Sequence, residues 1–283
     1  MPLFSLLRYS GEMKNFLNAL LIWFTAATVV SANPPGWTAF TKGDFETART
    51  IGRRDGGAEG LAHACRAGLV LGGFSETGPT AIKSLHGAIA DCNKTLLLQP
   101  DHFFAKMSLA IALSFEGKRL KRPSYPLRAK AYILELIEQE PENPLGYGAL
   151  AAWHSEVSAA GFFARIALGA RRNKAEKNFA TALKLGAIDY ALKFEYVKFL
   201  ARGNQSARKR ALIKARILLQ ENTVMAFDQI LRKHCIVLAR ALERNNKPAI
   251  KKALIQATAF QGASPERVVE RFPLEALAPT GSN

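Results

Sequence analysis

One pattern of side-chain sizes occurs three times in the chain, at residues 88–100 (AIADCNKTLLLQP), 129–141 (AKAYILELIEQEP) and 175–187 (AEKNFATALKLGA). In each copy an alanine is followed four positions later by a bulkier residue, and three positions after that by a small or apolar one. Steps of four and three place side chains on one face of an α-helix. The pattern therefore predicts three amphipathic helices with turns at Pro100, Pro141 and Ala187.

A partner helix fits after each copy. The following stretches carry residues at the matching helical spacing: Leu109, Ala110 and Leu113; Tyr147, Leu150, Ala151 and His154; Tyr196, Val197 and Leu200. Small residues let two helices approach closely, and bulky ones fill the space to the next pair. We therefore expect an all-α protein whose antiparallel helix pairs stack as a solenoid of about 10–12 helices. A generic helical bundle would also show this apolar spacing.

These positions match the second helix of a tetratricopeptide repeat, whose fingerprint has Ala, an aromatic residue, Ala and Pro at the same offsets. The chain resembles this family over residues 37–260, with a compressed first copy around Trp37 and Phe40. It departs from the family pattern at Gly186, which stands in place of the closing proline, and at an insertion over residues 118–124. The resemblance implies a concave surface that binds a protein or a peptide.

Two further segments give local predictions. We expect a helix over Glu59–Leu71, ended by a left-handed turn at Gly72-Gly73. Residues Ala151–Arg172 are rich in small side chains and predict one long helix with an aromatic cluster. This segment is also similar to the helical T-component of periplasmic TRAP transporters, but the lipoprotein cysteine of those proteins is absent here.

The N-terminal segment has the features of a secretory signal peptide. Lys14 precedes an apolar run, Phe16–Val30, which is followed by small residues that suit cleavage after Ala32. Residues 1–12 are interpreted as an upstream start, because Met13 makes a better beginning. A periplasmic or secreted protein is therefore predicted, and an uncleaved N-terminal membrane anchor is the alternative. The predicted organisation is a leader over 1–32, a repeat domain over 33–260 and a partly disordered tail over 261–283.

The helix pair after the leader carries two cysteines. If it folds back near Ser75, Cys65 and Cys92 lie within about one turn of each other across the interface. In an oxidising compartment the two could form a disulfide, whereas the alternative is a pair of small core residues.

The chain is strongly basic, with a formal net charge of +16, and loss of the leader would leave +15. Zinc-finger spacing, RNA-binding aromatic motifs and helix-turn-helix patterns do not stand out, so nucleic acid is not the expected partner. An exported cationic protein meets anionic lipid head groups and cell-wall polymers instead.

Candidate binding residues come from two places. The predicted basic loop at 118–124 supplies Arg119, Lys121 and Arg122, because insertions in solenoids map to loops on one face. The repeat helices around the long small-residue segment supply Tyr147, Trp153, His154, Phe162 and Phe163. The simpler interpretation of Trp153 and the two phenylalanines is that they belong to the core.

Sequence motifs for catalysis, cofactors or metals are not found. The five histidines lack metal-ligand spacing, and His154 and Glu156 point to different sides of a helix. We therefore expect a non-enzyme without cofactor or metal, namely an adaptor or assembly factor of the cell envelope that binds a protein or peptide in its concave groove. The alternative is an electrostatic binder of an anionic membrane surface or cell-wall polymer. A helical-repeat enzyme that acts on cell-wall material is a third alternative.

Overall fold

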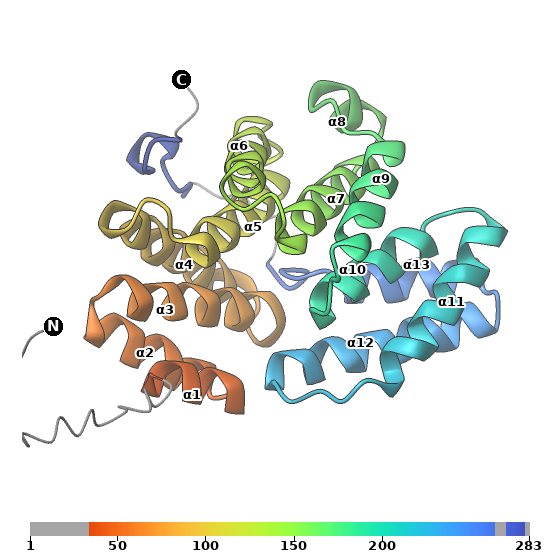
Figure 1. The fold of residues 1–283 in the computed structure, drawn as a ribbon, viewed down its shortest axis with the longest axis horizontal. Helices are drawn as coiled ribbons and strands as arrows, with labels where there is room; N and C mark the ends of the chain where they lie inside the picture. The colour runs from red at the N-terminus through yellow and green to blue at the C-terminus, as the bar shows by residue number, and fades with distance from the viewer. Residues whose placement is uncertain (1–33, 264–269, 281–283) are drawn as a thin grey trace, which may run out of the picture. The chain divides into compact units, whose positions relative to one another are not determined.

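The fold is known from a computed structural model, which describes residues 34–263 and 270–280. These residues contain thirteen α-helices and no strand, which confirms the all-α prediction (Figure 1). A π-helical turn follows at Leu71–Ser75 and a 3₁₀ turn at Leu274–Ala276. The predicted leader lies outside the described residues. The helices are α1 (Pro35–Lys42), α2 (Phe45–Asp55), α3 (Ala58–Val70), α4 (Gly78–Leu98), α5 (Phe103–Leu120), α6 (Ser124–Gln139), α7 (Pro144–Ala159), α8 (Phe162–Ala167), α9 (Arg172–Lys184), α10 (Tyr190–Ala201), α11 (Gln205–Gln220), α12 (Ala226–Glu243) and α13 (Lys247–Gln256).

The helices pack in pairs: α3 with α4, α5 with α6, α7 with α9, α10 with α11, and α12 with α13. The three sequence patterns fall on α4, α6 and α9, which end two or three residues before the predicted turn positions. All nine positions of the pattern are buried, with exposed fractions between 0% and 3%. The size pattern therefore marks the face that each of these helices packs into the core, and burial of this face is the main source of stability.

The glycine pair after α3 does not end the helix in a left-handed turn, so that prediction was wrong. The chain runs through Gly72 and Gly73 as a π-helical turn, and neither residue has a positive φ. A Cβ atom on Gly72 would lie 2.7 Å from the ring of Phe260, and one on Gly73 would lie 3.0 Å from Ala259. Glycine is thus needed for close approach of the chain that follows α13, which sequence spacing does not reveal.

The predicted long helix over residues 151–172 was also wrong, because it is divided into three. Helix α7 ends at Ala159, the six-residue α8 follows, and α9 begins at Arg172. The two connections contain Gly161 with a φ of 126° and Gly169 with a φ of 65°. Both values lie outside the right-handed helical region, so the chain changes direction at each glycine. This division adds α8 to the expected helices.

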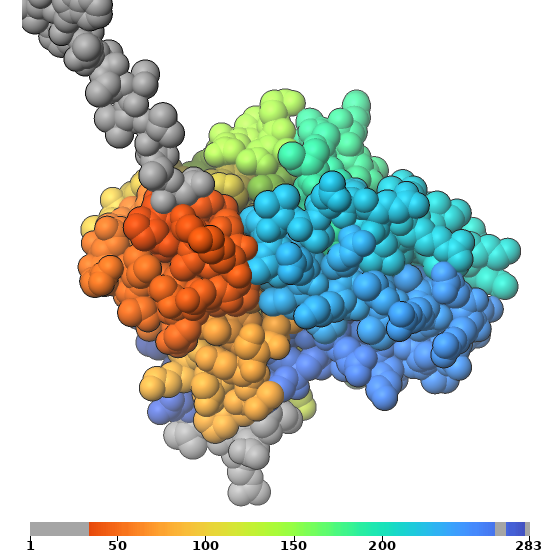
Figure 2. All heavy atoms as spheres, turned by 90° about the horizontal axis from the view of Figure 1, so that it is seen from below, coloured from red at the N-terminus to blue at the C-terminus, as the bar shows by residue number. Residues whose placement is uncertain are grey.

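The two ends of the helical array touch each other. Helix α1 contacts α12, and the rings of Phe74 and Phe227 lie 5.9 Å apart between centroids. The amide of Phe260 donates to the carbonyl of Gly73 at 2.9 Å. Figure 2 shows the red-orange surface of the first helices against the blue surface of α12. An open solenoid has contacts only between neighbouring repeats, so this array differs by closing between its two ends.

Residues 34–283 form a compact unit of their own, and the three hydrophobic clusters of the described chain lie within it. Within this unit Cys65 of α3 and Cys92 of α4 are joined by a disulfide, with sulfur atoms 1.99 Å apart and Cα atoms 5.3 Å apart. Of the two alternatives that the sequence left open for these cysteines, the structure has the disulfide. The third cysteine, Cys235, is buried and free.

The disulfide should stabilise the fold measurably. It closes a loop between residues 27 apart in the sequence, and loops of this size are worth about 2–4 kcal/mol. We predict that the double variant Cys65→Ala/Cys92→Ala of residues 34–283 loses free energy of unfolding of this order in urea. A reducing agent should destabilise the wild type but leave the double variant unchanged. Equal stabilities of oxidised and reduced wild type would contradict the prediction.

Candidate functional site

The C-terminal segment 270–280 lies against the helices α4, α5 and α6. The sequence placed these residues in a partly disordered tail, but in the structure they have defined partners. Residues 264–269 and 281–283 lie outside the described chain. The side chains that bond to the segment are Asn93 of α4, Glu116 and Arg119 of α5, and Tyr125, Arg128 and Tyr132 of α6. The last turn of α5 and the facing sides of α4 and α6 thus form one site, called here the tail site. His86 of α4 belongs to it through its contact with Glu116.

Asn93 binds the backbone of the segment with both ends of its amide. Its Nδ2 donates to the carbonyl of Ala276 at 2.8 Å, and its Oδ1 accepts from the amide of Ala278 at 2.6 Å. The Asn93 side chain is buried, at 8% exposure. Because one carboxamide supplies both a donor and an acceptor, it satisfies two backbone groups of the segment, the carbonyl at the end of the 3₁₀ turn and the amide two residues later. The contact does not depend on the side chains of the bound segment.

Two tyrosines of α6 hold the backbone at two further points. The hydroxyl of Tyr132 donates to the carbonyl of Ala278 at 2.6 Å, and that of Tyr125 donates to the carbonyl of Phe272 at 2.7 Å. The tyrosines are seven residues apart and therefore lie two turns apart on one helix face. Burial raises the pKa of Tyr132 to about 12, so its phenol remains a donor at physiological pH.

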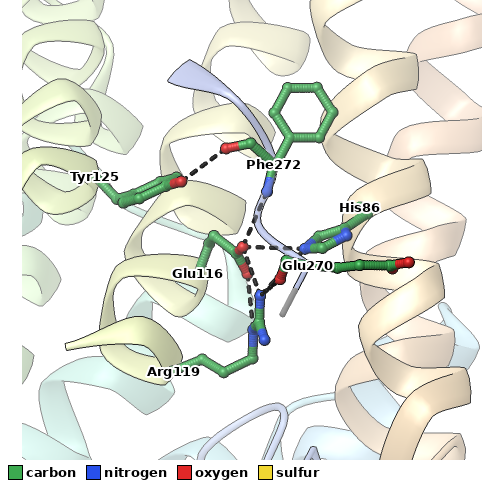
Figure 3. Close-up of polar contacts among 6 residues, drawn as sticks. All are labelled: His86, Glu116, Arg119, Tyr125, Glu270 and Phe272. Carbon is green, nitrogen blue, oxygen red and sulfur yellow. Dashed lines mark hydrogen bonds and ion pairs between the residues drawn. The ribbon is translucent and has the colours of Figure 1, made fainter. Parts of the chain in front are cut away.

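A buried carboxylate lies at the start of the segment. Glu116 has no exposed surface and accepts from the guanidinium of Arg119 at 2.9 and 2.6 Å. Nε2 of His86 lies 3.0 Å from Oε1 of Glu116, and the amide of Phe272 donates to the same oxygen at 3.3 Å. Arg119 also donates to the carbonyl of Glu270 at 3.1 Å. Figure 3 shows Phe272 between Tyr125 and this carboxylate, so the ion pair and the segment hold each other in place.

The charge of Glu116 is favoured in this setting. Burial raises the pKa of the carboxyl group, but hydrogen bonds from His86 and Arg119, together with their charges, outweigh burial and hold the pKa below its ordinary value. The site therefore contains a carboxylate that remains ionised at neutral pH.

Apolar contacts complete the tail site. Leu277 and Ala278 are buried in the same hydrophobic cluster as α4, α5 and α6, and Phe272 and Leu274 pack against it half-buried. The ring of Phe272 meets the His86 ring edge-on, with centroids 6.3 Å apart. The tail site thus combines sequence-independent backbone hydrogen bonds with apolar anchors, which is an arrangement suited to binding a peptide segment.

The structure brings only Arg119, of the predicted binding residues, into the tail site. Arg119 was expected in an exposed basic loop, but it lies in the last turn of α5 with its side chain 5% exposed. The expected loop is shorter than predicted, because α5 continues to Leu120 and α6 begins at Ser124. Lys121, with a φ of 53°, and Arg122 remain exposed in this turn.

The aromatic candidates are scattered. Trp153 is buried and donates from its indole to the carbonyl of Pro126 at 2.9 Å. His154 is buried, and burial together with the charges of two lysines lowers its pKa to about 4. Tyr147 is half-buried against α9 and α10. Phe162 and Phe163 are exposed on α8.

Two cavities, of about 210 and 400 Å³, lie elsewhere: one between α1, α2 and α3, the other between α12 and α13. Neither contains a predicted binding residue. In the described part of the chain no group of three or more His, Cys, Asp or Glu side chains is placed to hold a metal ion. Within the same residues no helix is long and apolar enough to cross a membrane.

Comparison with known proteins leaves the family open. No protein-family model matches the chain, and no curated protein and no solved structure was found that matches it.

Loss of the Glu116 charge should destabilise the chain strongly. We predict that Glu116→Gln leaves Arg119 as an uncompensated buried charge and lowers the free energy of unfolding in urea by about 3–5 kcal/mol. The matched control is Glu176→Gln, whose partner Arg210 is half-exposed at 3.4 Å, and which should cost less than about 1 kcal/mol. Equal effects of the two substitutions would contradict the role assigned to Glu116.

The same carboxylate predicts a pH dependence. Because its pKa is lower in the folded state, its contribution to stability is complete above the unfolded value of about 4.3 and is lost as the pH falls through the folded value. The wild type should therefore lose more stability than Glu116→Gln between neutral pH and acid pH in urea titrations. Parallel profiles for the two proteins would show that Glu116 does not carry this dependence.

Proposed function

We propose that this chain is a non-catalytic, tetratricopeptide-like repeat protein that works as an adaptor or assembly factor in the cell envelope by binding a peptide segment of a partner protein. The observation that carries the proposal is the tail site. There Asn93, Tyr125 and Tyr132 bond to backbone atoms of residues 270–280. A peptide with apolar residues in the matching places that follows the same backbone course, including the 3₁₀ turn at Leu274–Ala276, could make the same bonds.

The proposed binding surface differs from the one that the sequence predicted. The resemblance implied a concave groove, whereas the tail site is formed by the second helices of two neighbouring pairs, α4 and α6, with the end of α5 between them. In this proposal the chain's own segment occupies the site until a partner segment replaces it. Replacement is feasible because the hydrogen bonds involve backbone atoms that every peptide carries.

Two features support the proposed export. The leader-like segment at residues 1–32 is followed by a separate compact unit, and the Cys65–Cys92 disulfide is of the kind that persists in oxidising compartments.

A salt-resolved capture experiment tests the proposal. Residues 34–283, residues 34–263 and residues 34–263 with Asn93→Ala are immobilised and exposed to envelope extract of the source organism. We expect the form without the tail to retain one stoichiometric protein through a high-salt wash, the full form to retain less of it, and Asn93→Ala to lose it. Circular dichroism melting of each form controls for folding.

The alternative function, electrostatic binding of an anionic polymer or membrane, predicts a different pattern. Its complexes weaken as salt screens the charges. Loss of everything at high salt from all three forms, with lipid or wall polymer in the eluate, would overturn the adaptor proposal. So would retention of the same protein by all three forms.

A further inference from the structure

Helix α8 presents an unusually apolar face to solvent. The exposed fractions of Phe162, Phe163 and Ile166 are 60%, 85% and 62%. Ile166 follows Phe162 by four residues and Phe163 by three, so the three side chains share one helix face. None of the six residues of α8 is buried. We refer to these three side chains as the α8 tip.

The backbone holds the α8 tip in this position. Gly161 and Gly169, at the two ends, adopt positive φ values, and a Cβ on either would meet nothing within 4 Å. Glycine is therefore required here by backbone direction and not by packing. Directly after the helix, Leu168 and Ala170 are buried in the core cluster of α4, α5 and α6. The chain thus leaves the core at Gly161 and returns to it near Gly169. Figure 1 shows α8 at the outer end of α7 and α9.

The surroundings of the tip are cationic. Between residues 161 and 184 the sequence has six basic residues and one acidic residue, Glu176, which pairs with Arg210. Arg165 lies over the ring of Phe162 at 5.3 Å from its centroid. Arg171 and Lys174 are exposed, and their side chains have no ion pair among the described residues.

We propose that the α8 tip inserts into the surface of an anionic lipid bilayer, with Arg165, Arg171 and Lys174 contacting the head groups. Large apolar side chains next to basic residues are the combination by which peripheral segments bind membranes, since apolar burial adds to attraction by anionic lipid. The surface is independent of the tail site, so one chain could hold a partner segment while it is attached to a membrane.

The size of the tip favours lipid over a protein partner. A stable protein interface uses about 20–30 residues a side and a hydrophobic core surrounded by a polar rim. The tip offers three apolar side chains on a six-residue helix, and its positive surroundings complement the charge of a phospholipid surface. A convex apolar tip of this size fits between lipid chains without a matching pocket.

Vesicle sedimentation tests the proposal directly. Residues 34–283, which contain no leader, are mixed with vesicles of equal parts phosphatidylglycerol and phosphatidylcholine or of phosphatidylcholine alone. We expect binding to the anionic vesicles and at least about tenfold weaker binding by Phe162→Ser/Phe163→Ser. The matched control is Ile188→Ser/Val224→Ser, which removes two apolar side chains elsewhere that are at least as exposed, and this variant should bind like the wild type.

A second pair of variants tests the charges. Arg171→Glu/Lys174→Glu should weaken binding to the anionic vesicles, and Lys251→Glu/Lys252→Glu on α13 should weaken it less, although the net charge changes equally. A tryptophan at the tip, Phe163→Trp, should shift its emission to shorter wavelength on vesicle addition.

Three outcomes would overturn the proposal. The wild type could fail to bind either kind of vesicle, or Phe162→Ser/Phe163→Ser could bind as tightly as the wild type. Binding without a shift in the emission of Phe163→Trp would show electrostatic attachment through another surface. If vesicles are not bound but Phe162→Ser/Phe163→Ser abolishes capture of a protein, the tip belongs to a protein interface instead.

Discussion

The closeness of the paired helices is the constraint on which the rest of the structure depends. Gly68 of α3 faces Ala88 of α4 so tightly that a Cβ on Gly68 would lie 3.2 Å from that of Ala88. Only small residues permit such an approach. The close approach of α3 and α4 brings Cys65 within disulfide distance of Cys92. It also fixes the orientation of α4, so that Asn93, the residue after Cys92, faces the C-terminal segment. Packing on one side of α4 therefore positions hydrogen bonding on the other.

The tail site is a case in which buried polar groups are stable because each has a partner. An unpaired buried amide or carboxylate would cost more than a typical hydrogen bond gains. Here Asn93 pairs with backbone groups, and Glu116 pairs with Arg119, with His86 and with the amide of Phe272. Removal of the segment would leave several of these groups facing water or unpaired. This is the physical reason that an unoccupied site would accept another peptide segment.

The sequence predicted the helices well because their signal is local. Spacing at 88–100 and its two copies located α4, α6 and α9. The approximate fold-back of one helix pair made a Cys65–Cys92 disulfide one of two alternatives, because spacing does not give the distance between the Cα atoms. The breaks around α8 were missed because a single glycine in a helical stretch is usually tolerated, and only its φ value shows that it ends a helix. The closing contact at Gly72 and Gly73 was missed because its partner, Phe260, is far away in the sequence.

The tail site was harder to predict for the same reason. Asn93 looks like an ordinary polar residue beside the repeat pattern, and its partners lie 183 and 185 residues further on. Weak signals did exist: Tyr125 and Tyr132 are two helical turns apart, and Phe272, Leu274 and Leu277 make the tail more apolar than a solvated segment needs to be. Neither signal specifies which helices the tail meets.

Binding of a labelled peptide tests most directly whether the tail site recognises peptide backbone. A peptide of residues 270–280 is titrated with residues 34–263 and followed by fluorescence anisotropy. We expect saturable binding to residues 34–263. Binding to residues 34–283 should be weaker, because their own segment fills the site. Binding to the Asn93→Ala variant of residues 34–263 should be about tenfold weaker, since two hydrogen bonds are lost. Asn178→Ala, which removes a surface asparagine on α9, should bind like the wild type. If folded residues 34–263 do not bind the peptide, or if the Asn93→Ala form binds it equally well, the tail site does not recognise peptide backbone in this way.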